Sequence, residues 1–183
     1  MKILQDLKLI CPKVYCDNRG FFREIYREES YGKFVQDNHS FSEKGVLRGM
    51  HFQRHPGQAK LITVIHGEIF DVAVDMRPHS STFGKWEGVN LSAENQYQLF
   101  IPIGFAHGFC VLSEGAHVIY KVSHPYVAEE EMTFRYDDPQ INICWPIGKP
   151  RLSERDANTA SFHEVVNEIM DCGKKRASWA HAP

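Results

Sequence analysis

Glycine and proline turns divide the middle of this chain into short extended segments. The segments are rich in apolar and β-branched residues, which is typical of β-strands. The pattern predicts strands at Lys60–Ile65, Glu68–Asp75, Phe83–Leu91, Gln96–Ile101, Gly108–Leu112, His117–Ser123 and Ile141–Trp145. Many short strands at nearly even spacing favour a β-sandwich or a β-barrel.

Two of these segments define a local arrangement. Lys60–Ile65 and Glu68–Asp75 are separated only by a His-Gly pair, a spacing that predicts a β-hairpin. Side chains alternate between the two faces of a strand, so Asp71 and Asp75 share one face of the second segment. We therefore expect that the acidic face of this strand is in contact with water.

Helical patterns occur only towards the two ends. One short helix is predicted within Glu28–Gln36, and a second candidate region opens at Ser153–Asp156. Apolar residues at helical spacing also mark Ser161–Asp171, while the basic and small-residue tail at Gly173–Pro183 is expected to fray. The simplest organisation is one domain over residues 1–183.

Composition excludes several classes of protein. A net charge of −2 gives no electrostatic reason to expect binding to nucleic acid. No apolar run approaches the roughly 20 residues that span a bilayer, and the first residues lack the apolar stretch of a signal peptide. The 5 cysteines are odd in number and form no Cys-x-x-Cys pair, which favours reduced thiols in a cytoplasmic protein.

One segment combines strand character with residues that carry chemistry. Gly45 is followed by His51-Phe-Gln53, then by Lys60, and after six more residues by Gly67. The spacing resembles the first motif of the cupin barrels, in which a second histidine and a glutamate complete a metal site. Gln53 stands where that histidine belongs, and Lys60 where the glutamate belongs. An ammonium cannot ligate a cation, so we expect a pocket that uses a fixed positive charge instead of a metal.

A second cupin-type motif appears at Pro102-Ile-Gly104-Phe-Ala-His107. His51 and His107 are then the only imidazoles at ligand positions. Two histidines without a carboxylate or thiolate make a poor metal site, so neither a metal nor a cofactor is expected. An isolated histidine is more simply explained as a buried core residue, but the flanking motifs favour a pocket here.

The chain as a whole closely resembles the dTDP-4-dehydrorhamnose 3,5-epimerases, from about Pro12 to Ala160. Segments that carry the resemblance occur in the family's order with compatible spacing; they are Asp17–Glu24, Gln36–Ser40, Val46–Gln53, Gly67–Asp75, Val89–Asn95, Ile101–Phe109, Ile119–Lys121 and Leu152–Asp156. The resemblance implies a mainly β, cupin-type jelly roll and metal-independent epimerisation at C3 and C5 of dTDP-4-dehydro-6-deoxy-D-glucose. The product is dTDP-4-dehydro-L-rhamnose, on the route to dTDP-L-rhamnose and cell-surface polysaccharide.

The reaction that the resemblance implies needs three groups. Both reacting carbons lie beside the C4 carbonyl, so removal of either proton places charge on O4. The resemblance assigns His51 as the base, Lys60 as the cation near O4 and Tyr120 as the acid on the opposite face. An imidazole with an ordinary pKa near 6.5 suits proton abstraction, and a phenol near 10 can return a proton.

Two further residues are assigned to the reaction by the same resemblance. Asp156 is the expected carboxylate partner of the His51 imidazole; taken alone, it would be a helix-capping or first-turn acid. His107 is expected to donate to the sugar or to orient Lys60.

The resemblance also assigns residues to the nucleotide end of the substrate. Arginine forks suit a diphosphate, although an arginine seen alone is more often a solvated surface cation. The positions that match the family's binding residues are Arg19, Glu24, Gln36, Asn38, Arg48, Tyr126, Glu131 and Arg155. Family members are homodimers in which an arginine like Arg19 reaches the neighbouring subunit's site.

Two other functions remain open at this point. One is an epimerase that inverts a single centre, C3 or C5, of a related 4-keto nucleotide sugar. The other is a non-catalytic, sugar-binding cupin, which predicts the loss of His51 or Lys60; both are present. The order of the two epimerisations, the nucleotide base preference and the downstream glycan are not determined by the sequence.

Overall fold

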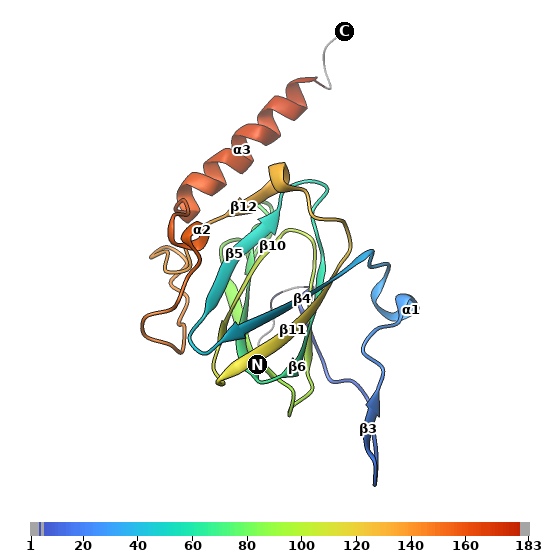
Figure 1. The fold of residues 1–183 in the computed structure, drawn as a ribbon. Helices are drawn as coiled ribbons and strands as arrows, with labels where there is room; N and C mark the ends of the chain where they lie inside the picture. The colour runs from blue at the N-terminus through green and yellow to red at the C-terminus, as the bar shows by residue number, and fades with distance from the viewer. Residues whose placement is uncertain (1–3, 5, 180–183) are drawn as a thin grey trace.

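Two five-stranded antiparallel sheets face each other and form the body of the protein (Figure 1). The computed structural model describes residue 4 and residues 6–179, with side chains described as far as residue 171. The first sheet has the order β1 (Lys8–Ile10), β9 (Gln98–Ile101), β6 (Lys60–His66), β11 (Gly115–Val122), β4 (Gln36–Glu43). The second has the order β12 (Glu131–Thr133), β5 (Leu47–Gln53), β10 (Phe105–Val111), β7 (Glu68–Asp75), β8 (Trp86–Ser92). The mainly β class predicted from the sequence is confirmed.

The space between the sheets holds the first hydrophobic core. Alternation along β7 sends Ile69 and Ala73 into this core and Val72 and Val74 to the other side of the sheet. The predicted division of this strand into two faces is therefore correct. The expectation of a wet acidic face is wrong, because Asp71 and Asp75 are both fully buried.

Buried acids of this kind need partners, and Asp75 has them close by in the chain. Its Oδ2 accepts hydrogen bonds from the Ser80 and Thr82 hydroxyls, each at 2.6 Å, and from Arg77 Nη2 at 2.8 Å. Burial opposes the charge of Asp75, yet these donors lower its pKa to about 2. An acid on an inward strand face can thus be structural.

A second core covers the outer side of the β7 sheet. The apolar residues at 141–145 pack there with the start of α3 (Phe162–Trp179). This segment is not a strand, contrary to the prediction for Ile141–Trp145. An apolar run indicates that a segment is buried. Whether the segment forms a strand also depends on a neighbouring strand with an unpaired edge.

The β6 and β7 strands do not form the predicted hairpin. They follow each other directly, but β6 pairs with β11 and β9, while β7 pairs with β10 and β8. The turn at Gly67, with φ of +78°, carries the chain from one sheet to the other. A short spacing between strands cannot distinguish a hairpin from such a crossing.

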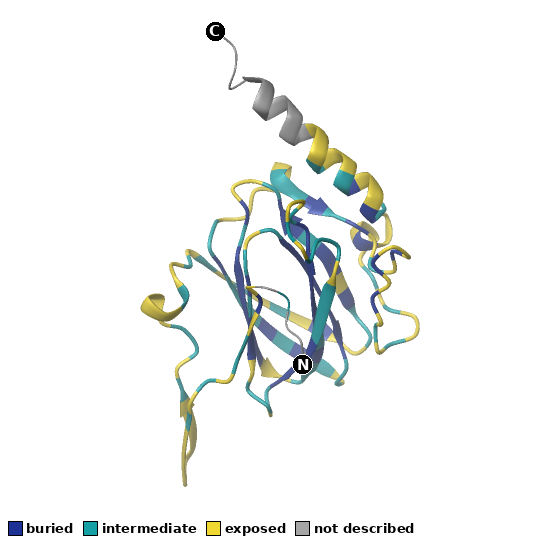
Figure 2. Cartoon of the chain, turned by 180° about the vertical axis from the view of Figure 1, so that it is seen from behind, coloured by how far each residue is buried: buried dark blue, intermediate teal, exposed yellow. Residues whose placement is uncertain are grey.

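The ends of the chain lie away from the two sheets. A hairpin of β2 (Val14–Asp17) and β3 (Gly20–Arg23) projects from the body, and its side chains are largely exposed (Figures 1 and 2). The helix predicted within residues 28–36 is only α1 (Glu28–Tyr31), because Gly32 follows it with φ of +79° and β4 begins soon after.

The C-terminal elements are helical. A short turn, α2 (Glu154–Ala157), precedes α3, which continues to Trp179, so the backbone at 173–179 is helical where a frayed tail was expected. Residues 180–183 of that tail lie outside the described residues. The remaining element is a 3₁₀ turn, η1 (Ala128–Glu130). No helix in the described part of the chain is long and apolar enough to cross a bilayer.

A close approach of two glycines aligns the central strands of the second sheet. Gly49 on β5 has φ of +137°, and a Cβ there would lie 2.6 Å from the Cα of Gly108 on β10. The strand register shifts at this point, between His107 and Phe109. The contact places His51 directly opposite His107.

We predict that Gly49→Ala lowers the free energy of unfolding by roughly 2–4 kcal/mol, because it combines backbone strain with a collision against backbone atoms. The measurement is urea denaturation. Gly20→Ala is the matched control, since Gly20 has a similar φ of +131° but nothing within 4 Å of the added Cβ. Equal losses in the two variants would contradict a role for the close approach.

Candidate active site

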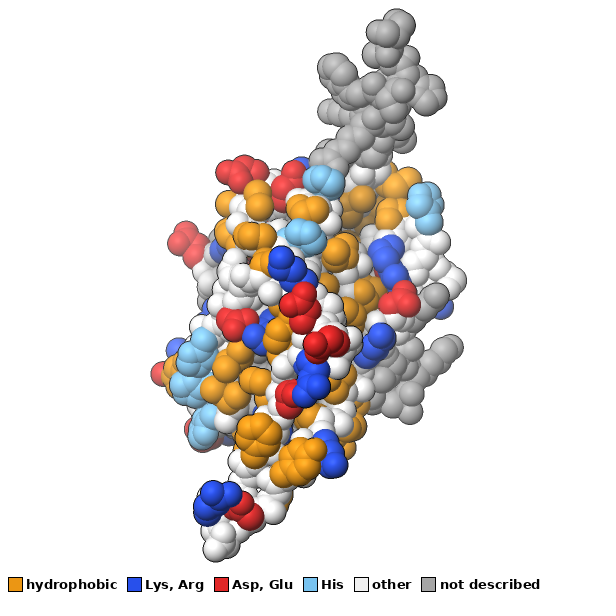
Figure 3. Space-filling model, turned by 90° about the vertical axis from the view of Figure 1, so that its right-hand side faces the viewer, with side chains coloured by type: hydrophobic (Ala, Val, Ile, Leu, Met, Phe, Trp, Pro, Cys, Tyr) orange, Lys and Arg blue, Asp and Glu red, His pale blue; other side chains and the backbone are white. Residues whose placement is uncertain are grey.

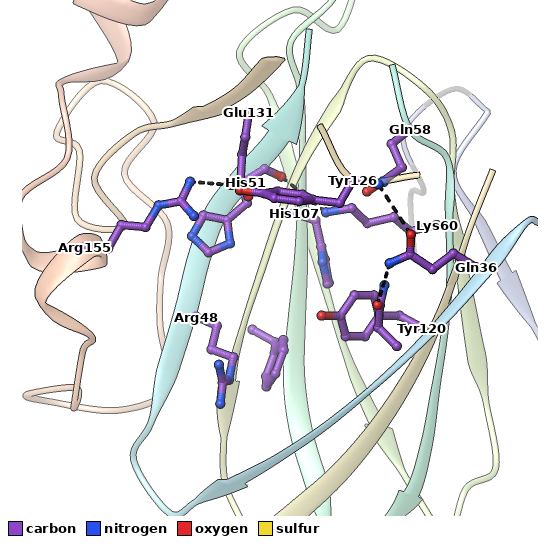
Figure 4. Close-up of a pocket in the computed structure, with 12 residues that line it drawn as sticks. Gln36, Arg48, His51, Gln58, Lys60, His107, Tyr120, Tyr126, Glu131 and Arg155 are labelled. Atoms are coloured by element: carbon purple, nitrogen blue, oxygen red, sulfur yellow. Dashed lines mark hydrogen bonds and ion pairs between the residues drawn. The ribbon is translucent and has the colours of Figure 1, made fainter. Parts of the chain in front are cut away.

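One pocket collects most of the predicted site residues from both sheets (Figure 4). Its walls are formed by β4, β5, β6, β10, β11 and β12, with loop residues at the rim. The lining residues are Gln36, Asn38, Arg48, His51, Gln58, Lys60, His107, Phe109, Tyr120, Tyr126, Glu131 and Arg155.

His51 is held by a buried carboxylate. Its Nε2 lies 2.7 Å from Oδ1 of Asp156, which comes from the first turn of α2. Burial raises the pKa of Asp156, but the hydrogen bond and charge of His51 outweigh burial, and the pKa is held below its usual value. A carboxylate can only accept, so Nε2 carries the hydrogen and Nδ1 is free to take a proton.

The two interpretations offered for Asp156 are compatible in the structure. Ser153 caps α2 by accepting a hydrogen bond from the Asp156 backbone N–H at 3.1 Å, so the residue does belong to a capped first turn. Its carboxylate reaches His51 at the same time. The cap fixes the backbone from which that carboxylate extends.

His107 has a carboxylate partner of its own. Its Nε2 lies 2.9 Å from Oδ2 of Asp71, and both side chains are buried. Burial lowers the pKa of His107, although Asp71 raises it, so the imidazole favours the neutral form with its hydrogen on Nε2. The other oxygen of Asp71, Oδ1, has no hydrogen-bond partner among the described residues.

Lys60 extends into the pocket towards His107 (Figure 4). It is buried, and its Nζ lies 3.5 Å from the backbone oxygen of His51. Burial lowers its pKa to about 8, against the opposing charges of Glu131 and Asp71. Lys60 is therefore mostly an ammonium at neutral pH, with donor capacity still available inside the pocket.

Tyr120 approaches from the other sheet. It lies on β11, whereas His51 lies on β5, and Figure 4 shows the two side chains on different sides of the pocket. Burial raises the pKa of the Tyr120 phenol, although Arg48 lowers it. The phenol therefore keeps its proton at neutral pH and can act as an acid.

The rim of the pocket is polar and internally paired. Glu131 Oε2 accepts a hydrogen bond from the Tyr126 hydroxyl at 2.6 Å and pairs with Arg155. Gln36 Nε2 donates to Asn38 Oδ1 at 2.8 Å. The rim thus offers a guanidinium, an exposed aromatic ring and amide groups to a ligand.

Arg48 occupies a separate part of the lining. Its Nε donates to the Ser42 hydroxyl at 2.9 Å, and Nη2 donates to the backbone oxygen of Phe41 at 3.3 Å. These contacts hold its charge at the pocket, and no acidic side chain among the described residues forms an ion pair with it. Such a guanidinium can accept an anionic ligand.

Gln53, at the altered cupin ligand position, does not line the pocket. It is buried, and its Oε1 accepts a hydrogen bond from the Val127 backbone N–H at 2.8 Å, so it anchors the segment that carries Tyr126. Lys60 alone of the two changed positions faces the pocket. Within the described residues, no three His, Cys, Asp or Glu side chains are grouped so that they could hold a metal ion.

Two predicted residues lie outside this pocket. Arg19 is at the tip of the β2–β3 hairpin and pairs with Asp17 at 2.6 Å. Glu24 follows that hairpin and pairs with Arg27 at 2.5 Å. Within one chain, neither side chain reaches the pocket lining.

Sequence reasoning missed three residues of the site. Asp71 was noted only for its strand face, and its contact with His107 depends on pairing between β7 and β10. Gln58 and Phe109 line the pocket without a distinctive motif of their own. Alternation along β10 places Phe109 on the same face as His107, which was the available signal.

The arrangement suits proton transfer on a molecule that carries a carbonyl group. An imidazole with a free Nδ1 and a protonated phenol come from facing sheets, and a buried ammonium lines the same pocket. Such a set can remove a proton beside a carbonyl, stabilise the resulting oxyanion and return a proton to the opposite face.

Comparisons with known proteins agree with this chemistry. The model of the dTDP-4-dehydrorhamnose 3,5-epimerase family matches residues 2–164. The dTDP-4-dehydrorhamnose 3,5-epimerase of Shigella flexneri is 52% identical over 167 residues, which are 87% of this chain and 92% of that protein.

Solved structures with the same fold include two with bound sugar nucleotides. The dTDP-6-deoxy-D-glucose-3,5-epimerase RmlC from Legionella pneumophila Philadelphia 1, in complex with dTDP-4-keto-L-rhamnose, has a TM-score of 0.88 and 47% identity over 92% of this chain and 94% of that one. ChmJ, a 3'-monoepimerase from Streptomyces bikiniensis in complex with dTDP-quinovose, has a TM-score of 0.83 and 31% identity over 94% and 91%.

We predict that Lys60 titrates near pH 8 rather than near its ordinary value of 10.5. The Asp71→Asn variant should titrate at a still lower pH, because the carboxylate that favours the ammonium is removed while the amide oxygen can still accept from His107. The measurement is an NMR pH titration of the Lys60 side-chain methylene next to Nζ, assigned by the signal missing in Lys60→Arg. A midpoint near 10.5 would show that the burial of Lys60 does not perturb it.

Proposed function

Because the chain belongs to the dTDP-4-dehydrorhamnose 3,5-epimerase family, we propose that its pocket inverts C3 and C5 with His51 as the base, Lys60 at O4 and Tyr120 as the acid. The protein is an epimerase that converts dTDP-4-dehydro-6-deoxy-D-glucose into dTDP-4-dehydro-L-rhamnose. Its reaction belongs to dTDP-L-rhamnose biosynthesis. The observation that carries the assignment of roles is the placement of a carboxylate-paired imidazole and a protonated phenol on facing sheets.

The first step is removal of a ring proton by His51. Nδ1 is the free nitrogen, because Nε2 is bonded to Asp156. The imidazole becomes an imidazolium, and the Asp156 carboxylate stabilises that charge across a 2.7 Å contact. Asp156 keeps its negative charge throughout, since its pKa lies below the usual value.

The electrons left on carbon move to O4 of the sugar. In the pocket, the enolate oxygen loses its hydrogen bonds to water. The fixed and buried positive charge of the Lys60 ammonium stabilises it instead. A well-placed donor of this kind contributes about 3–4 kcal/mol to transition-state stabilisation. Asp71 supports this role, because its charge favours the ammonium form of Lys60 and its Oδ2 orients His107.

The last step returns a proton from the other face. The Tyr120 phenol gives its proton to carbon, the C4 carbonyl re-forms, and the phenolate and the imidazolium then exchange protons with water. Inversion needs two groups on two faces, because a lone base would return its proton to the face from which it came. The same cycle at the second carbon completes the conversion.

The nucleotide end of the substrate is assigned to the rim. Arg48 and Arg155 supply positive charge for the diphosphate, and the exposed Tyr126 ring offers a stacking surface for the base. Gln36 and Asn38 contribute amide groups to the sugar side, and Glu131 positions Tyr126 and Arg155 through its carboxylate.

We also assign Arg19 and Glu24 to a site that is completed by a second subunit. The β2–β3 hairpin projects from its own body and carries exposed Phe21 and Phe22, so a homodimer would cover apolar surface and bring Arg19 to a neighbouring pocket (Figure 2). Cytoplasmic placement fits the four described cysteines, which are all free.

An epimerase that inverts one centre is the alternative. ChmJ demonstrates that a 3'-monoepimerase can share this fold. The identity of 52% to the 3,5-epimerase of Shigella flexneri, against 31% to ChmJ, supports inversion at both carbons.

Solvent exchange tests the reaction directly. In D2O with EDTA present, proton NMR of dTDP-4-dehydro-6-deoxy-D-glucose should show deuterium entering at both C3 and C5. Tyr120→Phe should still exchange the proton that His51 removes, while product formation falls by roughly 10²–10⁴. Exchange at one carbon alone would identify a single-centre epimerase, and no exchange at either would exclude this substrate.

Subunit complementation tests the shared site. We expect Arg19→Ala and His51→Asn each to be weakly active, and their co-expressed mixture to recover roughly a quarter of wild-type activity. Half of random dimers are mixed, and one of the two sites in each mixed dimer then has both residues. No recovery, with mixed dimers verified by mass spectrometry, would place Arg19 in its own chain's site, and full activity of Arg19→Ala alone would place it outside any site.

A further inference from the structure

Gln53 is a buried polar side chain to which the reaction assigns no role. It lies on β5, two residues from His51, where the cupin-type motif has a metal ligand. It does not line the pocket, yet both ends of its side-chain amide form hydrogen bonds with residues 123–127. We call these residues, which connect β11 to η1, the rim segment.

The Gln53 amide holds the backbone on both sides of Tyr126. Its Oε1 accepts a hydrogen bond from the Val127 N–H at 2.8 Å, and its Nε2 donates to the backbone oxygen of Pro125 at 3.4 Å. One orientation of the amide satisfies both groups, because a backbone N–H can only donate and a carbonyl oxygen can only accept. The residue that carries the aromatic ring is therefore fixed from inside the protein through its two neighbours.

Contacts at the start of the rim segment attach it to the loop before β6. The Ser123 N–H donates to the backbone oxygen of Ala59 at 3.0 Å, and the Ser123 hydroxyl accepts from the Ala59 N–H at 2.9 Å. Gln58 Nε2 donates to the backbone oxygen of His124 at 2.8 Å. These contacts end before Tyr126 and leave the backbone at 125–127 to be held by other groups.

Tyr126 itself is exposed, although it lines the pocket. Its hydroxyl donates to Glu131 Oε2 at 2.6 Å, and its N–H lies 3.4 Å from Gln36 Oε1. The rim segment runs along the right-hand side of the body in Figure 1, the side that Figure 3 turns to the viewer, where hydrophobic and charged side chains are mixed. Within the described residues, the 2.8 Å contact of Gln53 is the shortest that a side chain makes with the backbone at 125–127. Gln53 therefore determines where the backbone under this ring lies.

We propose that Gln53 is a positioning residue for nucleotide binding and holds Tyr126 where its ring stacks on the base of the substrate. The inference rests on the proposed function, in which the Tyr126 ring receives that base. Stacking requires two flat groups in contact over their faces, so a shift of the backbone under the ring weakens it. In the substrate, the diphosphate separates the base from the reacting carbons. The loss should therefore appear in binding rather than in the chemistry.

Binding of dTDP tests the proposal without turnover. In isothermal titration, Gln53→Met should weaken dTDP binding by about tenfold, because methionine has a similar shape but its thioether cannot donate and accepts only weakly. The matched control is Ser113→Ala, in the turn between β10 and β11 and outside the pocket. The Ser113 hydroxyl also joins two backbone groups, since it accepts from the Glu68 N–H and donates to the Gly115 oxygen, each at 2.8 Å. This control should bind dTDP like the wild type.

A double-mutant cycle shows whether Gln53 acts through Tyr126. Tyr126→Ala should weaken dTDP binding by about tenfold or more, and the addition of Gln53→Met to this variant should cause no further loss. Losses that multiply would show that Gln53 acts by another route and would overturn the proposal. Unchanged binding in Gln53→Met, equal losses in Gln53→Met and Ser113→Ala, or no binding of dTDP to the wild type would each overturn it as well.

Steady-state kinetics separate positioning from a general distortion of the site. Gln53→Met should raise KM by about tenfold and leave kcat unchanged. Gln53→Glu should have a lower KM than Gln53→Met, because its carboxyl oxygen accepts from the Val127 N–H in either charge state. A fall in kcat with KM unchanged would overturn the proposal. If the wild type did not turn over this substrate, the proposed function would fail, whereas the dTDP titrations would still decide the role of Gln53.

Discussion

A buried positive charge between two β-sheets is the constraint around which the pocket is built. The interior between two β-sheets is usually apolar and excludes charged groups, but Lys60 is buried there. Burial lowers its pKa to about 8. Asp71 and Glu131 keep the charged form favoured enough to persist at neutral pH. Each of these acids has another role in the pocket, since Asp71 holds His107 and Glu131 holds Tyr126 and Arg155. A change of charge at Lys60 would therefore affect both the His107–Asp71 pair inside the pocket and the residues that Glu131 holds at its rim.

Two imidazole–carboxylate pairs stand side by side, but their environments differ. His51 is partly exposed and its partner Asp156 comes from outside the barrel, on α2. His107 and Asp71 are both buried, and they come from paired strands of one sheet. The first pair can exchange protons with substrate and water, while the second is suited to orientation and charge. The close approach of Gly49 and Gly108 brings the two histidines opposite each other, so backbone packing sets the geometry of the chemistry.

The altered cupin positions have separate physical consequences. Lys60 supplies the charge that a metal would otherwise provide next to an oxyanion. Gln53 instead satisfies backbone groups of the segment at 125–127, which carries part of the pocket rim. A motif comparison identifies both positions as changed, but only the side-chain contacts distinguish a residue of the pocket from a residue that supports it.

Local patterns in the sequence were sufficient for the β class and for the six strands β6 to β11, but they did not predict the other six strands of the described residues. The cupin-type motifs and the family resemblance, rather than strand patterns, placed His51, Lys60, His107 and Tyr120 in one pocket, because no strand was predicted at His51. The strand patterns were wrong where the outcome depends on which strands pair. The β6 and β7 strands belong to different sheets, and the apolar residues at 141–145 are buried without being a strand. The family resemblance already indicated the pairing of His51 with Asp156. The pairing of His107 with Asp71 was decided by tertiary structure alone, because it depends on the register between β7 and β10, which are far apart in the chain.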